Sequence, residues 1–554
     1  MSDAMQKRLS VFLAFVLAAL LSLSVTEAKA EQPKLVVQIT IDALRGDMPL
    51  RLKDRFGPRG FRYLMEHGVY FTNVHYLHAN TYTAVGHATL ATGGHTAQHG
   101  MAGNKWYDRE TGRRIYSVED NRYTLIGKGP KAHQGTSPRN LTSSTVGDEL
   151  VLASGHEARV FSVSMKDRSA IIPGGHLGKA FWYDSSSGEF VTSTYYYKKY
   201  PAWVAAWNKA RPADKYRDTS WALMYDTASY IYGDADDRPF ERAIHDLGRT
   251  FPHSLKTEDT ETFYKSLRYT PFVDELTLAF AKELLKQEKL GQGDTIDMLA
   301  ISFSATDKIG HAFGPHSLEY EDNLLRLDAT LADLLAFLDA TNGLERTLVV
   351  LSADHGVNEI PEYKQSLGFQ AGRHNPKEFI ELANAALQNR FRSTDNFVLG
   401  FFRRPSLYLN RETIKKLGLD PETVEKALAE EILKVPGIAL AVARTDLLAG
   451  KLPNNPIMHK VERAFHPGRS GDVIIVQEQF WYLDENTTLS ANHGSPYSYD
   501  AHVPIMFAGP GIKPQTVYRL VAPADIAPTL SAFLGIKPPS GSVGTPLIEV
   551  LGGH

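Results

Sequence analysis

The strongest constraint on the fold is a series of short apolar segments that alternate with amphipathic helical segments. The first apolar segment, Leu-Val-Val-Gln-Ile-Thr-Ile at 35–41, has the β-branched composition of a buried strand. The pattern predicts strands at 35–41, 158–164, 296–303, 347–352 and 503–508, and helices at 61–67, 144–155, 273–286, 318–341 and 523–535. Strands that alternate with helices in this way indicate an α/β fold, with a mostly parallel central sheet covered by helices on both faces.

Charged side chains follow several of these strands at the point where each strand ends. In open α/β sheets, ligands bind beyond the carboxyl ends of the strands, so residues at these ends are candidates for a site. The charged residues placed in this way are Asp42, Lys166, Arg168, Asp307 and Asp354. The sequence therefore predicts a polar, functional edge of the sheet.

Two long stretches interrupt the alternation. The first, at about 176–290, is rich in aromatic residues, and Phe181–Tyr183 and Tyr195–Tyr197 suggest a hairpin. The second, at about 362–480, carries helix signals at 376–388 and 421–433 and precedes His493. We interpret both as cap segments inserted into one catalytic domain that spans residues 31–554.

The N-terminus has the organisation of a secretory signal peptide. Lys7-Arg8 is followed by an apolar run from Leu9 to Val25 and by the small-x-small sequence Ala28-Lys29-Ala30. The alternative is a retained membrane anchor, but the run is short and a cleavage site follows it. We therefore expect residues 1–30 to be removed from a periplasmic or secreted bacterial protein.

The charge balance and the lack of cysteine narrow the classes of partner and of metal site. The chain has 60 basic and 63 acidic residues, which gives no reason to expect a nucleic acid or a stable membrane partner. It has no cysteine, so any metal site must use histidine and carboxylate ligands. Neither feature specifies an oligomeric state.

The stretch from Asn80 to His87 predicts a turn that leads into a helix ending near Gly93. Thr83 is expected at or near the N-cap, where backbone N–H groups and the helix dipole favour an anion. A threonine hydroxyl can act as a nucleophile once a metal or a base removes its proton. The simpler alternative is that Thr83 only caps the helix.

Acidic and histidine residues cluster after two of the strands. Asp307 and His311 are four residues apart, so on a helix both face the same side and suit one metal. Asp354 and His355 follow a buried strand in the sequence Asp-His-Gly, where a charge requires a partner. His493, in a Gly- and Ser-containing loop, is by itself compatible with a structural role. Carboxylates and imidazoles without sulfur suit Zn²⁺, with Mn²⁺ or Fe also compatible.

Lys166 and Arg168 are two residues apart after a strand, so both side chains can reach one site. Arginine grips phosphate oxygens with two donors, whereas lysine acts as a point charge. The alternative is a solvated Lys-Asp-Arg turn. Together with two metals, such cations would stabilise phosphoryl transfer.

This combination resembles the alkaline phosphatase superfamily, and within it the PafA-type phosphatases with a threonine nucleophile. The motif Thr83-x-x-Gly-His87 is similar to the nucleophile turn of that group and of the nucleotide pyrophosphatases/phosphodiesterases, which usually carry Thr-x-x-Asn-His. The resemblance implies two Zn²⁺ ions, one bound by Asp307, His311 and His493, the other by Asp42, Asp354, His355 and the Thr83 oxygen. It further implies that Asn104, Lys166 and Arg168 bind phosphate oxygens, and it implies no metal role for His87.

The function implied by the resemblance is that of an exported alkaline phosphatase acting on small phosphorylated metabolites. Phosphate would pass to Thr83 as a phosphothreonine and then to water. The first alternative is a phosphodiesterase or nucleotide pyrophosphatase of the same superfamily, and the second is a noncatalytic protein that binds zinc or phosphate. A sulfatase is disfavoured, because no Cys/Ser-x-Pro-x-Arg motif lies near the first strand.

Overall fold

The computed structural model describes residues 32–399, 406–483 and 488–552. The predicted signal peptide at 1–30 lies outside the described residues, and its cleavage stays a prediction. Within the described ranges, every helix is either too short or too polar to cross a membrane.

A nine-stranded sheet forms the centre of the described part of the chain. Its strands, in spatial order, are β18 (Gln515–Val517), β2 (Val69–Phe71), β17 (Ile505–Ala508), β11 (Thr347–Ser352), β1 (Leu35–Ile41), β10 (Asp297–Phe303), β5 (Val160–Ser164), β6 (Lys179–Asp184) and β7 (Glu189–Val191). The strands from β11 to β6 run parallel, whereas β17 and β7 pair in the antiparallel direction. The prediction of a mostly parallel sheet is confirmed.

The register of the four central strands brings their carboxyl ends to one level. Thr40 of β1 pairs with Ser302 of β10 and with Ser352 of β11, and Ser302 pairs with Ser164 of β5. Because the side chains of β1 are buried on both faces, helices must cover both sides of the sheet. The loops after these four strands therefore open side by side at one edge.

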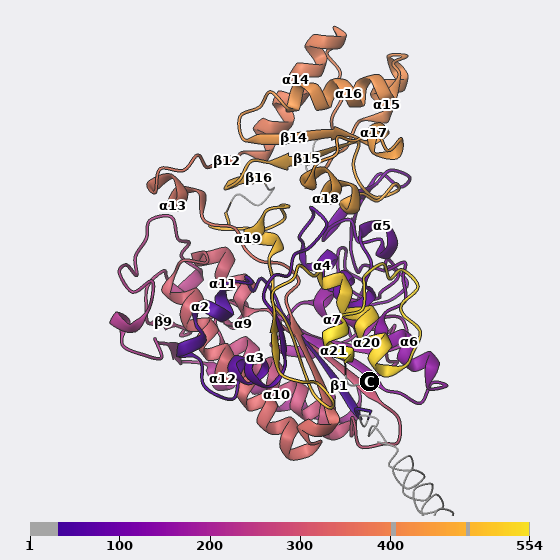
Figure 1. Ribbon diagram of the computed structural model, residues 1–554. Helices are drawn as coiled ribbons and strands as arrows, with labels where there is room; N and C mark the ends of the chain where they lie inside the picture. The colour runs from indigo at the N-terminus through magenta and orange to yellow at the C-terminus, as the bar shows by residue number, and fades with distance from the viewer. Residues whose placement is uncertain (1–31, 400–405, 484–487, 553–554) are drawn as a thin grey trace, which may run out of the picture.

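Helices lie on both sides of the sheet, as the alternation predicts (Figure 1). One side carries α3 (Phe61–His67), α10 (Phe272–Gln287) and α12 (Leu318–Thr341), and the other carries α4 (Thr83–Thr92), α6 (Val146–Ala153), α7 (Asp167–Gly174) and α20 (Ile526–Leu534). The helix predicted at 318–341 is confirmed to the residue. The shorter elements are α2 (Met48–Arg51), α5 (Thr96–His99), β3 (Lys105–Asp108), β4 (Arg113–Tyr116), α8 (Ala202–Ala210), β8 (Ser220–Trp221), β9 (His253–Ser254), α9 (Thr260–Leu267), α11 (Ala305–Phe313), α13 (Pro361–Ser366), α19 (Ser498–Ala501) and α21 (Ile548–Leu551).

The aromatic-rich stretch at about 176–290 is partly built into the central sheet. β6 pairs with β5 in parallel, so the chain is still in the sheet at Asp184. The predicted hairpin exists, but β6 pairs with β7 at 189–191, and Tyr195–Tyr197 lies beyond it. Strand alternation is weak in this stretch because aromatic residues pack on both faces of β6.

The second stretch builds a separate hydrophobic core. β13 (Ser406–Leu407), β15 (Val473–Gln477) and β14 (Ile438–Ala443) form a small sheet, on which α14 (Pro376–Phe391) and α16 (Pro421–Ile432) pack. Its other elements are β12 (Gly372–His374), α15 (Arg411–Lys416), α17 (Arg444–Leu448), α18 (Pro456–Ala464) and β16 (Trp481–Leu483). These elements form a lobe beyond the α4 and α11 end of the central sheet (Figure 1). The domain boundaries of both cap segments stay predictions.

Candidate active site

Thr83 is the first residue of α4 and is fully buried. The N-cap is Tyr82, one residue earlier, so the hydroxyl of Thr83 is not the helix cap. Instead, Thr83 Oγ1 lies 3.5 Å from Nε2 of His355, and Nη2 of Arg168 donates to it at 3.3 Å. The structure thus excludes the simple capping role and directs the hydroxyl toward the carboxyl edge of the sheet.

Gly86 explains how the start of α4 comes so close to this edge. A Cβ added to Gly86 would lie 1.9 Å from the backbone oxygen of Asp354, so only glycine permits the approach. His87 follows in the same helix and is buried. Its Nδ1 lies 2.9 Å from the carbonyl of Thr83, and its Nε2 lies 3.0 Å from the hydroxyl of Ser302. His87 is therefore a packed, hydrogen-bonding helix residue.

Three of the predicted ligands are histidines whose orientation is fixed by backbone carbonyls. Nδ1 of His311 donates to Ala491 at 2.8 Å, Nδ1 of His355 to Gly356 at 2.8 Å, and Nδ1 of His493 to Thr81 at 2.7 Å. A carbonyl oxygen can only accept, so each ring is protonated at Nδ1, and Nε2 is the nitrogen left to bind a metal. This arrangement is typical of metal-binding histidines.

The predicted carboxylates lie opposite these nitrogens. Among the described residues, Asp42 Oδ1, Asp307 Oδ1 and Asp354 Oδ2 are buried and have no hydrogen-bond partner. Asp307 Oδ1 lies 3.2 Å from Nε2 of His311 and 3.6 Å from Nε2 of His493. Buried carboxylate oxygens that accept no hydrogen bond, next to the Nε2 atoms of imidazoles, suit a cation, so the residues present fit a metal site.

The structure brings two groups of ligand atoms together, each within 4.8 Å. One is Asp307, His311 and His493, the set that the resemblance implies. The other is Asp42, Asp307 and His355, in which Asp307 stands where the resemblance has Asp354. Asp354 is nevertheless adjacent, since its Oδ2 lies 3.4 Å from Nε2 of His355 and its Oδ1 accepts from the backbone N–H of Ala43 at 3.1 Å.

Lys166 accounts for the position of Asp307. Its ammonium group lies 2.6 Å from Asp42 Oδ2 and 2.5 Å from Asp307 Oδ2, so it draws the two carboxylates together. Lys166 is the N-cap residue of α7 and is buried. The sequence predicts a phosphate contact for this lysine, whereas the contacts seen here are to predicted metal ligands.

Arg168 and Asn104, the other two residues predicted to bind phosphate, contact the first residues of α4. Arg168 is in the first turn of α7, beside Thr83 Oγ1, and its Nε is buried without a partner among the described residues. Asn104 Oδ1 accepts from the backbone N–H of Ala84 at 2.9 Å, which leaves its amide NH₂ as a donor. Both residues thus lie beside the start of α4, and their contacts to phosphate stay predictions.

Several supporting residues have no signal in the sequence. Tyr116 donates to Asp167, and Nη1 of Arg168 donates to the Tyr116 hydroxyl at 3.5 Å, which orients the guanidinium. The Ser304 hydroxyl donates to Asp42 Oδ2 at 3.0 Å. Tyr116 ends β4, far along the chain from Arg168, so only the folded structure relates the two.

Burial and neighbouring charges shift the pKa values of the carboxylates in this site in opposite directions. Burial and the neighbouring Asp354 raise the pKa of Asp42. Burial also acts to raise the pKa of Asp307, but Lys166 and His311 outweigh it and hold that pKa well below its ordinary value. Burial, with His355 and His311 nearby, lowers the pKa of His493 well below its ordinary value, so this imidazole is neutral. Neutral imidazoles and ionised carboxylates are the forms that bind metals.

Comparison with known proteins agrees with this geometry. The model of the type I phosphodiesterase/nucleotide pyrophosphatase family matches residues 36–497. The alkaline phosphatase PhoV of Synechococcus elongatus is 36% identical over 531 residues, covering 95% of this chain and 94% of PhoV. The alkaline phosphatase PafA of Elizabethkingia meningoseptica is 34% identical over 528 residues, covering 94% of this chain and 95% of PafA.

Two further similarities extend over nearly the whole chain. A protein named calcium-transporting ATPase, from Myroides odoratus, is 34% identical over 527 residues, covering 94% of this chain and 95% of that protein. The crystal structure of wild-type PafA superposes with a TM-score of 0.87 at 34% identity, covering 94% of this chain and 99% of that one.

The fold and the cluster of carboxylates, imidazoles and a helix-borne threonine define a hydrolase of the alkaline phosphatase superfamily. The chain belongs to the type I phosphodiesterase/nucleotide pyrophosphatase family and, within it, to the PafA-type alkaline phosphatases.

Proposed function

We propose that the protein is an exported, zinc-dependent phosphate monoesterase that uses Thr83 as its nucleophile. One observation carries the proposal: the Thr83 hydroxyl lies between a histidine of the metal cluster, His355, and the cation Arg168. A nucleophile in this position faces both the groups that activate it and those that bind phosphate. The alkaline phosphatases that match nearly the whole chain support the same activity.

The metal ligands fall into two sets around Thr83. Asp307, His311 and His493 would hold one Zn²⁺, and Asp42, Asp354, His355 and the Thr83 oxygen the other. Bound zinc would supply Lewis acidity to the oxygens that gain or lose a bond to phosphorus. The unpartnered carboxylate oxygens and the Nδ1-protonated imidazoles support this assignment.

The residues of the chain itself position and stabilise the transferring group. Thr83 Oγ1 forms a bond to phosphorus while the ester P–O bond breaks, and water later hydrolyses the phosphothreonine. Arg168 and the NH₂ of Asn104 donate to the nonbridging oxygens, where negative charge resides in the transition state. The first-turn N–H groups of α4 add a positive dipole end.

The cations favour a monoester over a diester. A monoester has about two negative charges near neutral pH and three nonbridging oxygens. A diester has one charge and two such oxygens, and its second substituent would occupy the place of a donor. Arg168, Asn104 and Lys166 offer donors for the additional oxygen, so small phosphorylated metabolites are the proposed substrates.

The test compares kcat/KM for an aryl phosphate monoester with that for the matched methyl aryl diester, using the mature chain loaded with zinc. We expect a clear monoester preference and a phosphothreonine that acid quenching traps from labelled monoester. A preference for the diester would overturn the monoesterase assignment in favour of the phosphodiesterase alternative. Absence of turnover on both esters, with two zinc ions bound, would favour a noncatalytic protein.

A further inference from the structure

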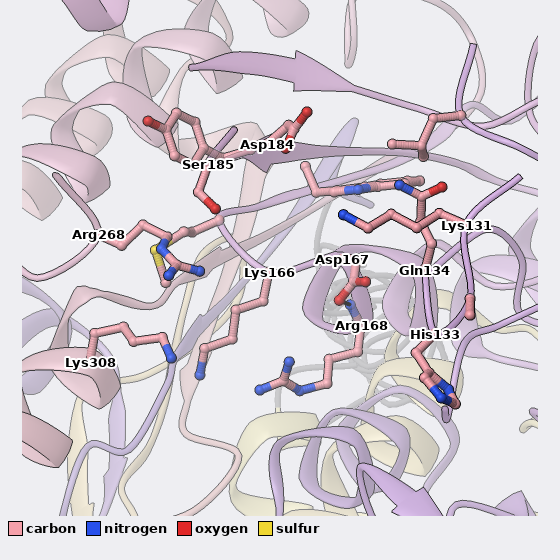
Figure 2. Close-up of a pocket in the computed structure, with 15 residues that line it drawn as sticks. Lys131, His133, Gln134, Lys166, Asp167, Arg168, Asp184, Ser185, Arg268 and Lys308 are labelled. Carbon is pink, nitrogen blue, oxygen red and sulfur yellow. Dashed lines mark hydrogen bonds between the residues drawn. The ribbon is translucent and has the colours of Figure 1, made fainter. Parts of the chain in front are cut away.

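A basic cavity adjoins the candidate phosphate site. It has a volume of about 270 Å³, and Lys166 and Arg168 form part of its lining. Figure 2 shows the side chains of Lys166, Lys308 and Arg168 pointing into a common space, with Arg268 above it and Lys131 toward the opposite side. The cavity is therefore continuous with the place where the transferred phosphoryl group would bind.

The cations of the outer part of this cavity have no carboxylate partner among the described residues, and Lys308 lies 5.8 Å from the centre of the Tyr269 ring. Among the described residues, Lys131, Arg268 and Lys308 form no ion pair with a carboxylate. The guanidinium of Arg268 makes one long hydrogen bond there, of 3.5 Å, to the carbonyl of Lys265. Arg268 and Lys308 are partly buried, where an unpaired cation is unfavourable.

The two carboxylates that line the cavity are already engaged elsewhere. Asp167 accepts from the Tyr116 hydroxyl and from the backbone N–H of Gly135. Asp184 pairs with Lys128 and accepts from Ser186. Neither carboxylate neutralises Arg268 or Lys308, so the cavity keeps an excess of positive charge.

We propose that this cavity is a second anion subsite, which binds an anionic group on the alcohol portion of the substrate. The preferred substrates are then phosphate monoesters that carry a second phosphate or a carboxylate. Arg268 is the main specificity residue, because it offers a planar set of donors and is not adjacent in sequence to a proposed metal ligand. The inference rests on the proposed phosphatase function, since it concerns the same site.

The experiment uses three esters of one three-carbon alcohol: 3-hydroxypropyl phosphate, propane-1,3-diol bisphosphate and 3-aminopropyl phosphate. They differ only in a neutral, anionic or cationic terminal group. For the zinc-loaded wild-type protein, we expect kcat/KM to be highest for the bisphosphate, by about tenfold beyond the twofold statistical advantage of its two equivalent ends. The cationic ester should be the poorest.

Arg268→Gln should reduce the ratio of bisphosphate to neutral ester about tenfold, because one charge-assisted contact is lost. Arg268→Lys should restore part of that ratio. The matched control is Lys265→Gln, which removes a cation from α9, the helix that Arg268 directly follows. Lys265 pairs there with Glu261 outside the cavity. This control should leave the ratio unchanged.

Equal kcat/KM for the three wild-type reactions would overturn the subsite, as would an equal loss on all three esters in Arg268→Gln. Failure of the phosphatase function is recognised separately, as absence of turnover on every ester. In that case, calorimetric titration with propane-1,3-bisphosphonate and with propylphosphonate tests the subsite. Wild-type protein should bind the bisphosphonate more tightly, and Arg268→Gln should lose that difference; equal binding would overturn the inference.

Discussion

The two sides of Thr83 carry opposite charge and have opposite requirements. On one side, Asp42, Asp307 and Asp354 each present a buried carboxylate oxygen that accepts no hydrogen bond from the described residues. On the other side lie the cations Arg168 and Arg268, neither of which forms an ion pair with a carboxylate of the described residues. The first side requires cations and the second requires anions, which is the charge pattern that a metal-dependent phosphatase needs.

Lys166 does not fit this division. Its backbone lies at the start of α7, the helix that also carries Arg168. Its ammonium group, however, contacts the carboxylates of Asp42 and Asp307. It can therefore support metal ligands, phosphate or both. A residue's position in a sequence motif therefore does not by itself decide whether its side chain contacts the metal ligands or the phosphate.

The largest expected effect comes from removing the group between the two sides. Thr83→Ala should lower kcat by several orders of magnitude and abolish the trapped phosphothreonine, because no other hydroxyl replaces it. Zinc should still bind through the remaining ligands. Thr83→Ser, the matched control, keeps the hydroxyl and should retain measurable turnover.

Rapid acid quenching with ³²P-labelled monoester and zinc analysis of the same samples check this prediction. Near-normal turnover of Thr83→Ala would mean that water attacks phosphorus directly, and the role given to the start of α4 would be wrong.

The next prediction removes one proposed metal ligand and leaves the cationic residues unchanged. His311→Ala should lower the zinc affinity of its own site and the turnover by about a hundredfold, since a ligand is lost while the contacts of Lys166 to Asp42 and Asp307 remain. The control is His253→Asn, which changes a buried histidine that contacts Leu247 and Glu319 rather than a proposed ligand, and it should keep both metals. Elemental analysis after dialysis and activity titrated with Zn²⁺ distinguish the two variants. Full zinc content in His311→Ala would contradict its assignment as a ligand.

The sequence was sufficient to predict most of the central architecture. Strands 35–41 and 347–352 and helix 318–341 were predicted correctly because apolar residues follow a clear period and recognisable end signals. The hairpin around Tyr195 was misplaced because aromatic residues signal burial without specifying which strands pair. Pairing depends on long-range register, which local composition does not encode.

The candidate site was partly predictable for a similar reason. Parallel strands end at one edge, so the charges that follow them converge there. His493 could not be assigned from its own loop, because its partner Asp307 is brought to it only by folding. The support of Arg168 by Tyr116 and the two contacts of Lys166 also depend on distances between remote segments.

Another prediction separates the roles of the two basic residues Lys166 and Arg168. The double variant Lys166→Ala/Arg168→Ala should lose several kcal/mol of monoester transition-state stabilisation, with each charge-assisted contact contributing roughly 1.5–3 kcal/mol. Diester kcat/KM should fall far less. Of the single variants, Arg168→Ala should reduce the monoester-to-diester ratio, whereas Lys166→Ala should also change zinc affinity.

Parallel kcat/KM measurements on both esters, with zinc titrations, test this division of roles. If the double variant lost the same factor on monoester and diester, the pair would serve the fold or the metals, and the physical basis for monoester selectivity would be lost.

The smallest expected effect concerns Asn104, whose side chain has two separable roles. Its Oδ1 accepts from the N–H of Ala84 in the first turn of α4, and its NH₂ is available to a phosphate oxygen. Asn104→Ala removes both and should lower monoester kcat/KM by about ten- to a hundredfold, the value of one or two hydrogen bonds to a charged group.

Asn104→Asp keeps the acceptor for Ala84 but replaces the donor by a negative charge. If phosphate binding dominates, Asn104→Asp should be less active than Asn104→Ala, because the carboxylate repels the substrate dianion. If positioning of α4 dominates, Asn104→Asp should instead recover activity, and the phosphate contact assigned to Asn104 would be wrong.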